Sequence, residues 1–152
     1  SPEVQLTILC DDPMLKNPVA TPIDLGTVEP GNLSIVDNYS TAPHGFKFNA
    51  TFTGTTTSVV IQDSINPDWR FIINPGLVAG LLHFQEYDQL FFSSEKGQRY
   101  LYILRLGQRL HIIDKIQANS IWPILFPGAN VMVHTPAMVI EDVSHRHTYW
   151  GV

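Results

Sequence analysis

The stretch HGFKFNATFT, residues His44–Thr53, alternates between apolar and polar side chains. Even-numbered positions from Phe46 to Phe52 carry Phe, Phe, Ala and Phe, whereas the odd-numbered positions from Lys47 onward carry Lys, Asn, Thr and Thr. Successive side chains of a β-strand point to opposite faces of the sheet, so this period of two predicts a strand with one buried face. It is the strongest strand signal in the chain.

Similar short runs, rich in β-branched and aromatic residues, recur between turn signals along the rest of the sequence. We expect further strands at Val4–Cys10, Leu33–Val36, Thr57–Gln62, Asp68–Ile73, Leu81–Phe84, Gln89–Ser93, Val131–Val133, Met138–Ile140 and His147–Val152. Residues 13–32 contain four prolines and two glycines and are expected to form a long connection with at most a short strand. No long window has a period of 3.6, and one helical turn is expected at Ile112–Ile116.

Three glycines mark turns. Lys96-Gly97 divides the clearest hairpin, in which Gly97 supplies the positive φ of a tight turn. Leu106-Gly107-Gln108 is expected to turn a second hairpin, and Pro127-Gly128 to fix the turn before Val131. About ten to twelve short strands in 152 residues imply two packed antiparallel sheets. The prediction is one all-β domain over residues 1–152, an antiparallel β-sandwich with little or no helix.

The composition excludes several function classes. A net charge of -5 without any basic run argues against nucleic-acid binding. No apolar stretch reaches the length of a membrane span, and we expect no signal peptide. The single cysteine, Cys10, is expected to be a buried, inert thiol. Charged residues make up only 15% of the chain, which suggests that a partner covers part of the surface. Because the chain opens on a strand without an initiator Met, we expect it to be a domain of a longer protein.

Histidines are the first candidates for a site, and the sequence contains six: His44, His83, His111, His134, His145 and His147. Positions i and i+2 of a strand share a face, so His145 and His147 can converge on one metal ion, with Glu141 or Asp142 as a third ligand. The competing interpretation, which we favour, is a solvated polar terminal segment. No cysteine pair or helical His-Glu-x-x-His pattern supports zinc, and we expect no metal or cofactor.

Catalysis is also not expected. There is no Gly-x-Ser-x-Gly elbow or Gly-rich phosphate loop, and the adjacent carboxylates of Asp11-Asp12 and Glu141-Asp142 point to opposite faces of a strand. Carbohydrate binding stays open as an alternative, because sandwich lectins stack an aromatic ring on a sugar. The candidate rings are Trp69, Trp122 and Trp150, although core or rim packing is the commoner role of tryptophans in a sandwich.

Four blocks of the sequence, in order, resemble the distal tail proteins of tailed phages. Val4–Pro13 resembles the start of the C-terminal domain of that family, and Tyr87–Arg99 resembles its Asp-x-Leu-x-Ile-x-Thr-x-x-Gly-x-Arg hairpin. Asn119–Asn130 resembles a segment that ends in Pro-Gly-x-Asn, and Tyr149–Val152 resembles the closing strand. The family usually has glycine before the hairpin Asp, where this chain has Tyr87.

The resemblance implies a structural role without catalysis. Distal tail proteins form a hexameric ring at the tail tip through an N-terminal part, and their C-terminal part is a galectin-like β-sandwich of the jelly-roll type. In some relatives that outer part holds receptor-binding proteins or touches host-surface sugars. Expected partners are the tail tube, the tape-measure or tip protein and the receptor-binding protein. The expected location is the tail tip of a virion made in the bacterial cytoplasm, and the isolated domain is expected to be a monomer.

Overall fold

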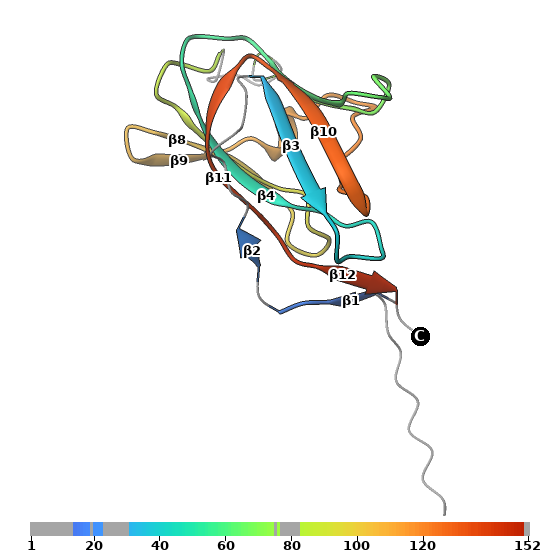
Figure 1. Ribbon diagram of the computed structural model, residues 1–152. Helices are drawn as coiled ribbons and strands as arrows, with labels where there is room; N and C mark the ends of the chain where they lie inside the picture. The colour runs from blue at the N-terminus through green and yellow to red at the C-terminus, as the bar shows by residue number, and fades with distance from the viewer. Residues whose placement is uncertain (1–13, 19, 23–30, 75, 77–82, 151–152) are drawn as a thin grey trace, which may run out of the picture.

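The structure, a computed structural model, describes residues 14–18, 20–22, 31–74, 76 and 83–150. These residues form antiparallel sheets with almost no helix, which confirms the predicted all-β class (Figure 1). No helix in the described part of the chain is long and apolar enough to cross a membrane. The expected strand Val4–Cys10, with Cys10, lies outside the described residues, as do Asp11-Asp12 and Leu81.

The described strands belong to three sheets. A four-stranded sheet has the order β3-β10-β5-β6, a six-stranded sheet has the order β2-β11-β4-β7-β8-β9, and β1 pairs with β12. The strands are β1 (Met14–Lys16), β2 (Thr21–Pro22), β3 (Asn32–Asp37), β4 (Lys47–Phe52), β5 (Val59–Asp63), β6 (Arg70–Ile73), β7 (Gln89–Ser93), β8 (Tyr100–Arg105), β9 (Gln108–His111), β10 (Gly128–Thr135), β11 (Met138–His145) and β12 (Thr148–Trp150).

The alternation seen in the sequence at residues 44–53 corresponds to β4, which lies between β11 and β7. Phe48, Ala50 and Phe52 are buried, and the residues between them are partly exposed. The ring of Phe48 stacks on Phe92 of the neighbouring strand at a centroid distance of 4.8 Å. Burial on one face of β4 therefore follows the period of two that the sequence shows.

The two larger sheets share one hydrophobic core. Phe71 of β6 meets Phe92 of β7 edge to face, with ring centroids 5.6 Å apart, so side chains from both sheets interdigitate. Figure 1 shows β3 and β10 in one layer, with β4, β8 and β9 belonging to the other. The buried core residues of the four-stranded sheet are Leu33, Ile35, Val59, Ile61, Phe71, Ile73 and Met132. Those of the six-stranded sheet are Phe48, Ala50, Phe52, Leu90, Phe92, Leu101, Ile103, Met138 and Val143.

The predicted turns have the expected backbone. Gly97, Gly107 and Gly128 all have positive φ, at 81°, 78° and 99°. The expected helical turn is a 3₁₀ helix, η2 (Ile113–Lys115). These short-range predictions are confirmed because each depends on one or two residues whose conformational preferences dominate locally.

A bulge in β11 changes which residues face the interior. The register with β4 shifts between Ile140 and Asp142, so Glu141 is the extra residue. Beyond this shift, Val143 and His145 are buried, whereas Asp142 is exposed. The strand was predicted to end at Ile140 because the bulge interrupts the alternation; it continues to His145.

The β1–β12 sheet adjoins the end of β3, as Figure 1 shows. The loop after β3 is hydrogen-bonded to the start of β12: Ser40 Oγ accepts from the amide of Thr148 at 3.0 Å, and the amides of Thr41 and Ala42 donate to the Thr148 carbonyl at 3.0 and 3.2 Å. The loop and the start of β12 are therefore held together by two main-chain hydrogen bonds and one to the Ser40 side chain.

Candidate functional site

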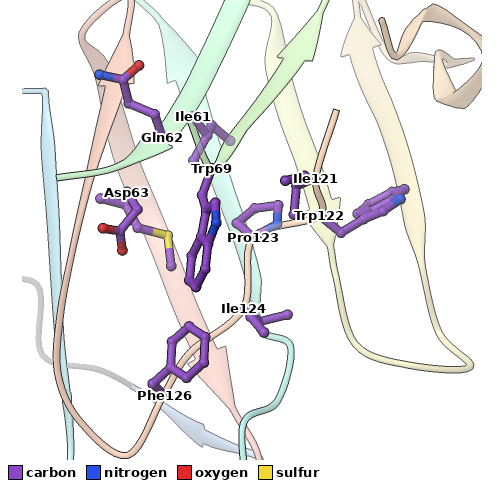
Figure 2. Close-up of a pocket in the computed structure, with 10 residues that line it drawn as sticks. Ile61, Gln62, Asp63, Trp69, Ile121, Trp122, Pro123, Ile124 and Phe126 are labelled. Carbon is purple, nitrogen blue, oxygen red and sulfur yellow. The ribbon is translucent and has the colours of Figure 1, made fainter. Parts of the chain in front are cut away.

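An apolar pocket of about 240 Å³ opens beside β5 and β10 (Figure 2). Most of its lining is apolar, and the segment 121–126 forms one wall. Its lining residues are Ile61, Gln62, Asp63, Trp69, Ile121, Trp122, Pro123, Ile124, Phe126 and Met132. Such a concave apolar surface is suited to an apolar group of a ligand or of a partner protein.

Trp69 is the most exposed aromatic ring of this pocket. It precedes β6, is 45% exposed, and stacks on Phe126 with ring centroids 5.7 Å apart. Figure 2 shows the ring of Trp69 extending into the pocket, whereas the ring of Trp122 points away from it. Asp63 is a polar lining residue, but its Oδ1 accepts the amides of Ile65 at 2.8 Å and Asn66 at 2.9 Å. That carboxylate oxygen is already engaged in a local turn.

A second candidate site is a buried cluster of one carboxylate and imidazoles. Asp37 ends β3, His44 lies in the following loop, and His145 ends β11. All three side chains are buried, with Asp37 at 1% exposure. One ligand atom from each lies within 4.8 Å of the other two, a grouping that suits a metal ion.

The distances within this cluster are short. His44 Nε2 lies 3.0 Å from His145 Nδ1 and 3.3 Å from Asp37 Oδ2, and His145 Nδ1 lies 3.7 Å from the same oxygen. His147 Nδ1 lies 3.3 Å from Asp37 Oδ1, and the ring of His147 meets that of His145 edge-on. The cluster thus joins the end of β3, the loop after it and the β11–β12 junction.

Burial and hydrogen bonding set the charges of the cluster. Burial acts to raise the pKa of Asp37, but hydrogen bonds from Ser40 and Tyr39, together with nearby His145, outweigh it and lower this pKa from 3.8 to about 2. Burial lowers the pKa of His44 and of His145. Near neutral pH the cluster therefore combines the Asp37 carboxylate with the neutral imidazoles of His44 and His145.

The structure corrects the interpretation of the histidines near the C-terminus. His145 is buried, at 4% exposure, and does not belong to a solvated segment. The expected proximity of His145 and His147 is confirmed, with ring centroids 5.0 Å apart. Their carboxylate neighbour is Asp37, however, and not Glu141 or Asp142, which are both exposed. The bulge at Glu141 is the physical reason, because it turns His145 inward and leaves both acids on the surface.

The other candidate residues do not gather at one place. His134 is buried with its Nδ1 3.0 Å from the Pro136 carbonyl, and His111 is exposed. Trp122 packs on the core ring of Phe71 at 4.7 Å. Trp150 lies on β12, and His83 contributes its carbonyl to Arg105. Trp69 alone of the three tryptophans extends into the apolar pocket.

Comparison with solved structures identifies a similar fold. No protein-family model matches the chain, and neither does any curated protein. The structure is similar to half of a phage distal tail protein. That protein is the SPP1 Dit (gp 19.1) protein, whose crystal structure is described as a paradigm of the hub adsorption apparatus in phages that infect Gram-positive bacteria. The TM-score is 0.58 at 17% identity, over 90% of this chain and 50% of the Dit chain.

The match confirms the resemblance to distal tail proteins at the level of the fold. The chain spans about half the length of Dit. Residues in the blocks that carried the resemblance have structural roles here: Asp88 pairs with Arg105, and Gly97 turns the β7–β8 hairpin. The Asn130 side chain accepts the Phe126 amide and donates to the Phe126 carbonyl, both at 2.8 Å, which closes the turn before β10.

Sequence reasoning missed Asp37 and His44 as members of a site. His44 and His145 are 101 residues apart, and neither Asp37 nor His44 belongs to a recognisable motif. The one available signal was the His145-x-His147 spacing, which pointed to one of the three members, His145.

Proposed function

We propose that this chain is the outer, C-terminal domain of a distal tail protein, a structural component of the phage tail tip without catalytic activity. The observation that carries the proposal is the fold similarity to Dit, which extends over 90% of this chain but half of the Dit chain. A match of that extent supports one domain of a two-domain protein. It also supports the galectin-like, jelly-roll assignment for the sandwich.

The structural roles of the resembling blocks support the same proposal. Asp88, Gly97 and Asn130 stabilise turns and strand ends, and none of them contributes to the apolar pocket or to the histidine cluster. Residues that match the family pattern and stabilise turns maintain the fold and form no reactive site. A scaffold holds neighbouring proteins through its surface and needs no reacting group.

In this role the domain is an attachment scaffold in the tail-tip assembly. Its partners are the tail tube, the tape-measure or tip protein and the receptor-binding protein, and the full-length protein forms a hexameric ring. The pocket beside Trp69 would receive an apolar side chain of a neighbouring tail-tip protein. Its volume of about 240 Å³, its apolar lining and the half-exposed indole support such a contact. The chain without its ring-forming part is a monomer in this proposal, which light scattering measures directly.

The test uses antibodies raised against this chain and electron microscopy of the phage that encodes it. Gold particles are expected at the tail tip, and preincubation of the antibody with the purified chain should abolish them. Labelling of the capsid, or no labelling of intact particles, would overturn the proposal. A matched pair of phage variants then tests the pocket: Trp69→Ala should reduce retention of the receptor-binding protein on tails, whereas Trp150→Ala, an exposed tryptophan outside the pocket, should not.

A second candidate function is binding of host-surface carbohydrate, which the half-exposed ring of Trp69 favours. An indole face beside Gln62 and Asp63 offers stacking together with polar groups. The largely apolar lining and the stacking of Trp69 on Phe126 fit a protein side chain better. A glycan array distinguishes the two: saturable binding that Trp69→Ala abolishes supports a lectin role, and no binding at millimolar sugar contradicts it.

A further inference from the structure

We infer that Asp37, His44 and His145 form a binding site for Zn²⁺, with one carboxylate and two imidazoles as protein ligands and a water molecule as the fourth ligand. The site is independent of the proposed tail-tip function. It would be a structural cross-link inside the domain.

The spacing of the ligand atoms fits a tetrahedral ion. Zinc bonds to nitrogen and oxygen of about 2.0 Å place the ligand atoms of a tetrahedron about 3.3 Å apart. The three distances between Asp37 Oδ2, His44 Nε2 and His145 Nδ1 are 3.0, 3.3 and 3.7 Å. They lie on both sides of that edge length, so small adjustments of the rings are enough to coordinate the ion.

Asp37 is held in the orientation that a ligand requires. Its Oδ1 accepts the backbone amides of Tyr39 at 3.1 Å and Ser40 at 2.9 Å, which fixes the plane of the carboxylate. Its Oδ2 is buried, has no hydrogen-bond partner, and faces His44 and His145. His147 Nδ1 lies 3.3 Å from the same Oδ1. One oxygen is thus engaged with the protein and the other is available to a cation.

His44 has the tautomer that a ligand requires. Its Nδ1 lies 3.1 Å from the carbonyl oxygen of Ala42, which can only accept, so Nδ1 carries the proton of the neutral ring. Nε2 therefore presents a lone pair toward the cluster. Metal-bound histidines commonly donate their second N–H to a carbonyl or carboxylate in this way, which fixes the ring and raises the basicity of the ligand nitrogen.

The cluster without a cation leaves one buried carboxylate oxygen, Asp37 Oδ2, without a hydrogen-bond partner. With Nε2 of His44 unprotonated, the one available proton in the 3.0 Å contact between the rings is that of His145 Nδ1. A proton on His145 Nδ1 makes a hydrogen bond to His44 Nε2, and no hydrogen bond is left for Asp37 Oδ2. A buried carboxylate oxygen without a partner is costly. When His145 carries its proton on Nε2 instead, a divalent cation at the centre accepts a lone pair from each of Asp37 Oδ2, His44 Nε2 and His145 Nδ1 and balances the negative charge.

The position of the site in the fold would let a bound ion cross-link segments that are distant in the sequence. The ion would join the end of β3 and the loop after it to the end of β11, where the β1–β12 sheet adjoins the sandwich. The chain has one cysteine and therefore no internal disulfide. A bound metal would provide the long-range cross-link that disulfides supply in other small domains.

The experiment measures Zn²⁺ binding to the untagged 152-residue chain after removal of metals with a chelator. Isothermal titration with ZnCl₂ is expected to show one ion per chain at micromolar or tighter affinity, and excess Zn²⁺ should raise the melting temperature reversibly. Mg²⁺, which prefers oxygen ligands, should not compete. Bound Co²⁺ should give the intense visible absorption of a tetrahedral site.

Variants assign the ligands. Asp37→Asn and His145→Gln are each expected to weaken binding about tenfold or more, because each removes a ligand or its charge. His111→Gln is the matched control, since His111 is exposed and outside the cluster. Circular dichroism in chelator identifies any variant that fails to fold. For such a variant, the Co²⁺ spectrum of the unaltered chain decides whether the site is tetrahedral. No saturable Zn²⁺ binding, binding unchanged in His145→Gln, or an octahedral Co²⁺ spectrum would each overturn the inference.

Discussion

The guanidinium of Arg105 holds both carboxylate oxygens of Asp88: Nε lies 3.1 Å from Oδ1 and Nη2 lies 2.8 Å from Oδ2. Asp88 is 2% exposed, and its Oδ2 also accepts the Gln85 amide at 2.8 Å. Arg105 Nη2 donates further to the His83 carbonyl at 2.9 Å. This ion pair connects the end of β8 to the turn before β7 at one edge of these two strands of the six-stranded sheet.

Arg105→Ala is expected to destabilise the domain by about 2 kcal/mol, because the buried Asp88 carboxylate loses its counter-charge. Chemical denaturation measures the change. Arg109→Ala is the matched control on the same hairpin: Arg109 is exposed and its guanidinium lies 4.3 Å from the centre of the Tyr102 ring, a contact worth about 0.5–1 kcal/mol. Equal losses in the two variants would contradict the role assigned to Arg105.

Tyr87→Gly is expected to stabilise the domain by about 0.5–1 kcal/mol. Tyr87 has a φ of 69°, a left-handed conformation that costs a residue with a β-carbon about 1–2 kcal/mol, which exceeds the entropic cost of glycine. Its side chain is 77% exposed, so little packing is lost. The distal tail proteins that this chain resembles usually have glycine here. Thermal denaturation should show a higher melting temperature for Tyr87→Gly than for Tyr87→Ala, which keeps the strain.

Local pattern was enough to predict much of the fold. The period of two located β4, and Gln89–Ser93 was predicted with the bounds that β7 has. The end of β11 was not predictable, because the bulge at Glu141 breaks the alternation and exposes two adjacent acids that resemble a turn. A bulge arises from the pairing of two strands, so the sequence of one strand alone does not predict it.

Of the three members of the histidine cluster, the sequence pattern pointed only to His145. The His145-x-His147 spacing is local, whereas Asp37 and His44 reach it through the order of the strands. Asp37 pairs with Gly128 in the four-stranded sheet, and His145 belongs to the six-stranded sheet. Their proximity depends on how the two sheets meet, which no short-range signal encodes.

Gly97→Val is expected to destabilise the domain by about 1 kcal/mol or more, because a β-branched residue resists the φ of 81° at this turn. Space is not the cause, since a β-carbon at Gly97 meets nothing within 4 Å. Gly54→Val is the matched control: a β-carbon there also meets nothing within 4 Å, and its φ lies outside the left-handed region. A melting temperature unchanged by Gly97→Val would refute the argument.

Gly45→Ala is expected to destabilise the domain by about 1–3 kcal/mol through steric overlap. A β-carbon at Gly45 would lie 2.3 Å from the Ser94 carbonyl oxygen and 2.5 Å from the Glu95 nitrogen, both backbone atoms that cannot rotate away. The adjacent bond from the Ser94 amide to the Phe46 carbonyl, at 2.9 Å, would have to lengthen. Urea denaturation measures the free energy of unfolding of Gly45→Ala and of the control Gly54→Ala. Similar values for the two variants would show that the main chain moves to relieve the overlap without a loss of stability.

Leu106→Asn is expected to stabilise the β8–β9 hairpin by about 0.5–1 kcal/mol. Leu106 and Gly107 connect strands paired at Arg105 and Gln108, and both have positive φ, at 50° and 78°. Two-residue turns with two positive φ values favour Asn-Gly, because the short amide tolerates the left-handed conformation. The Leu106 side chain is fully exposed, so no packing is lost. Leu106→Ala removes the same exposed surface but keeps the backbone strain. If thermal denaturation shows equal stabilisation by Ala and Asn, the gain does not come from the turn conformation.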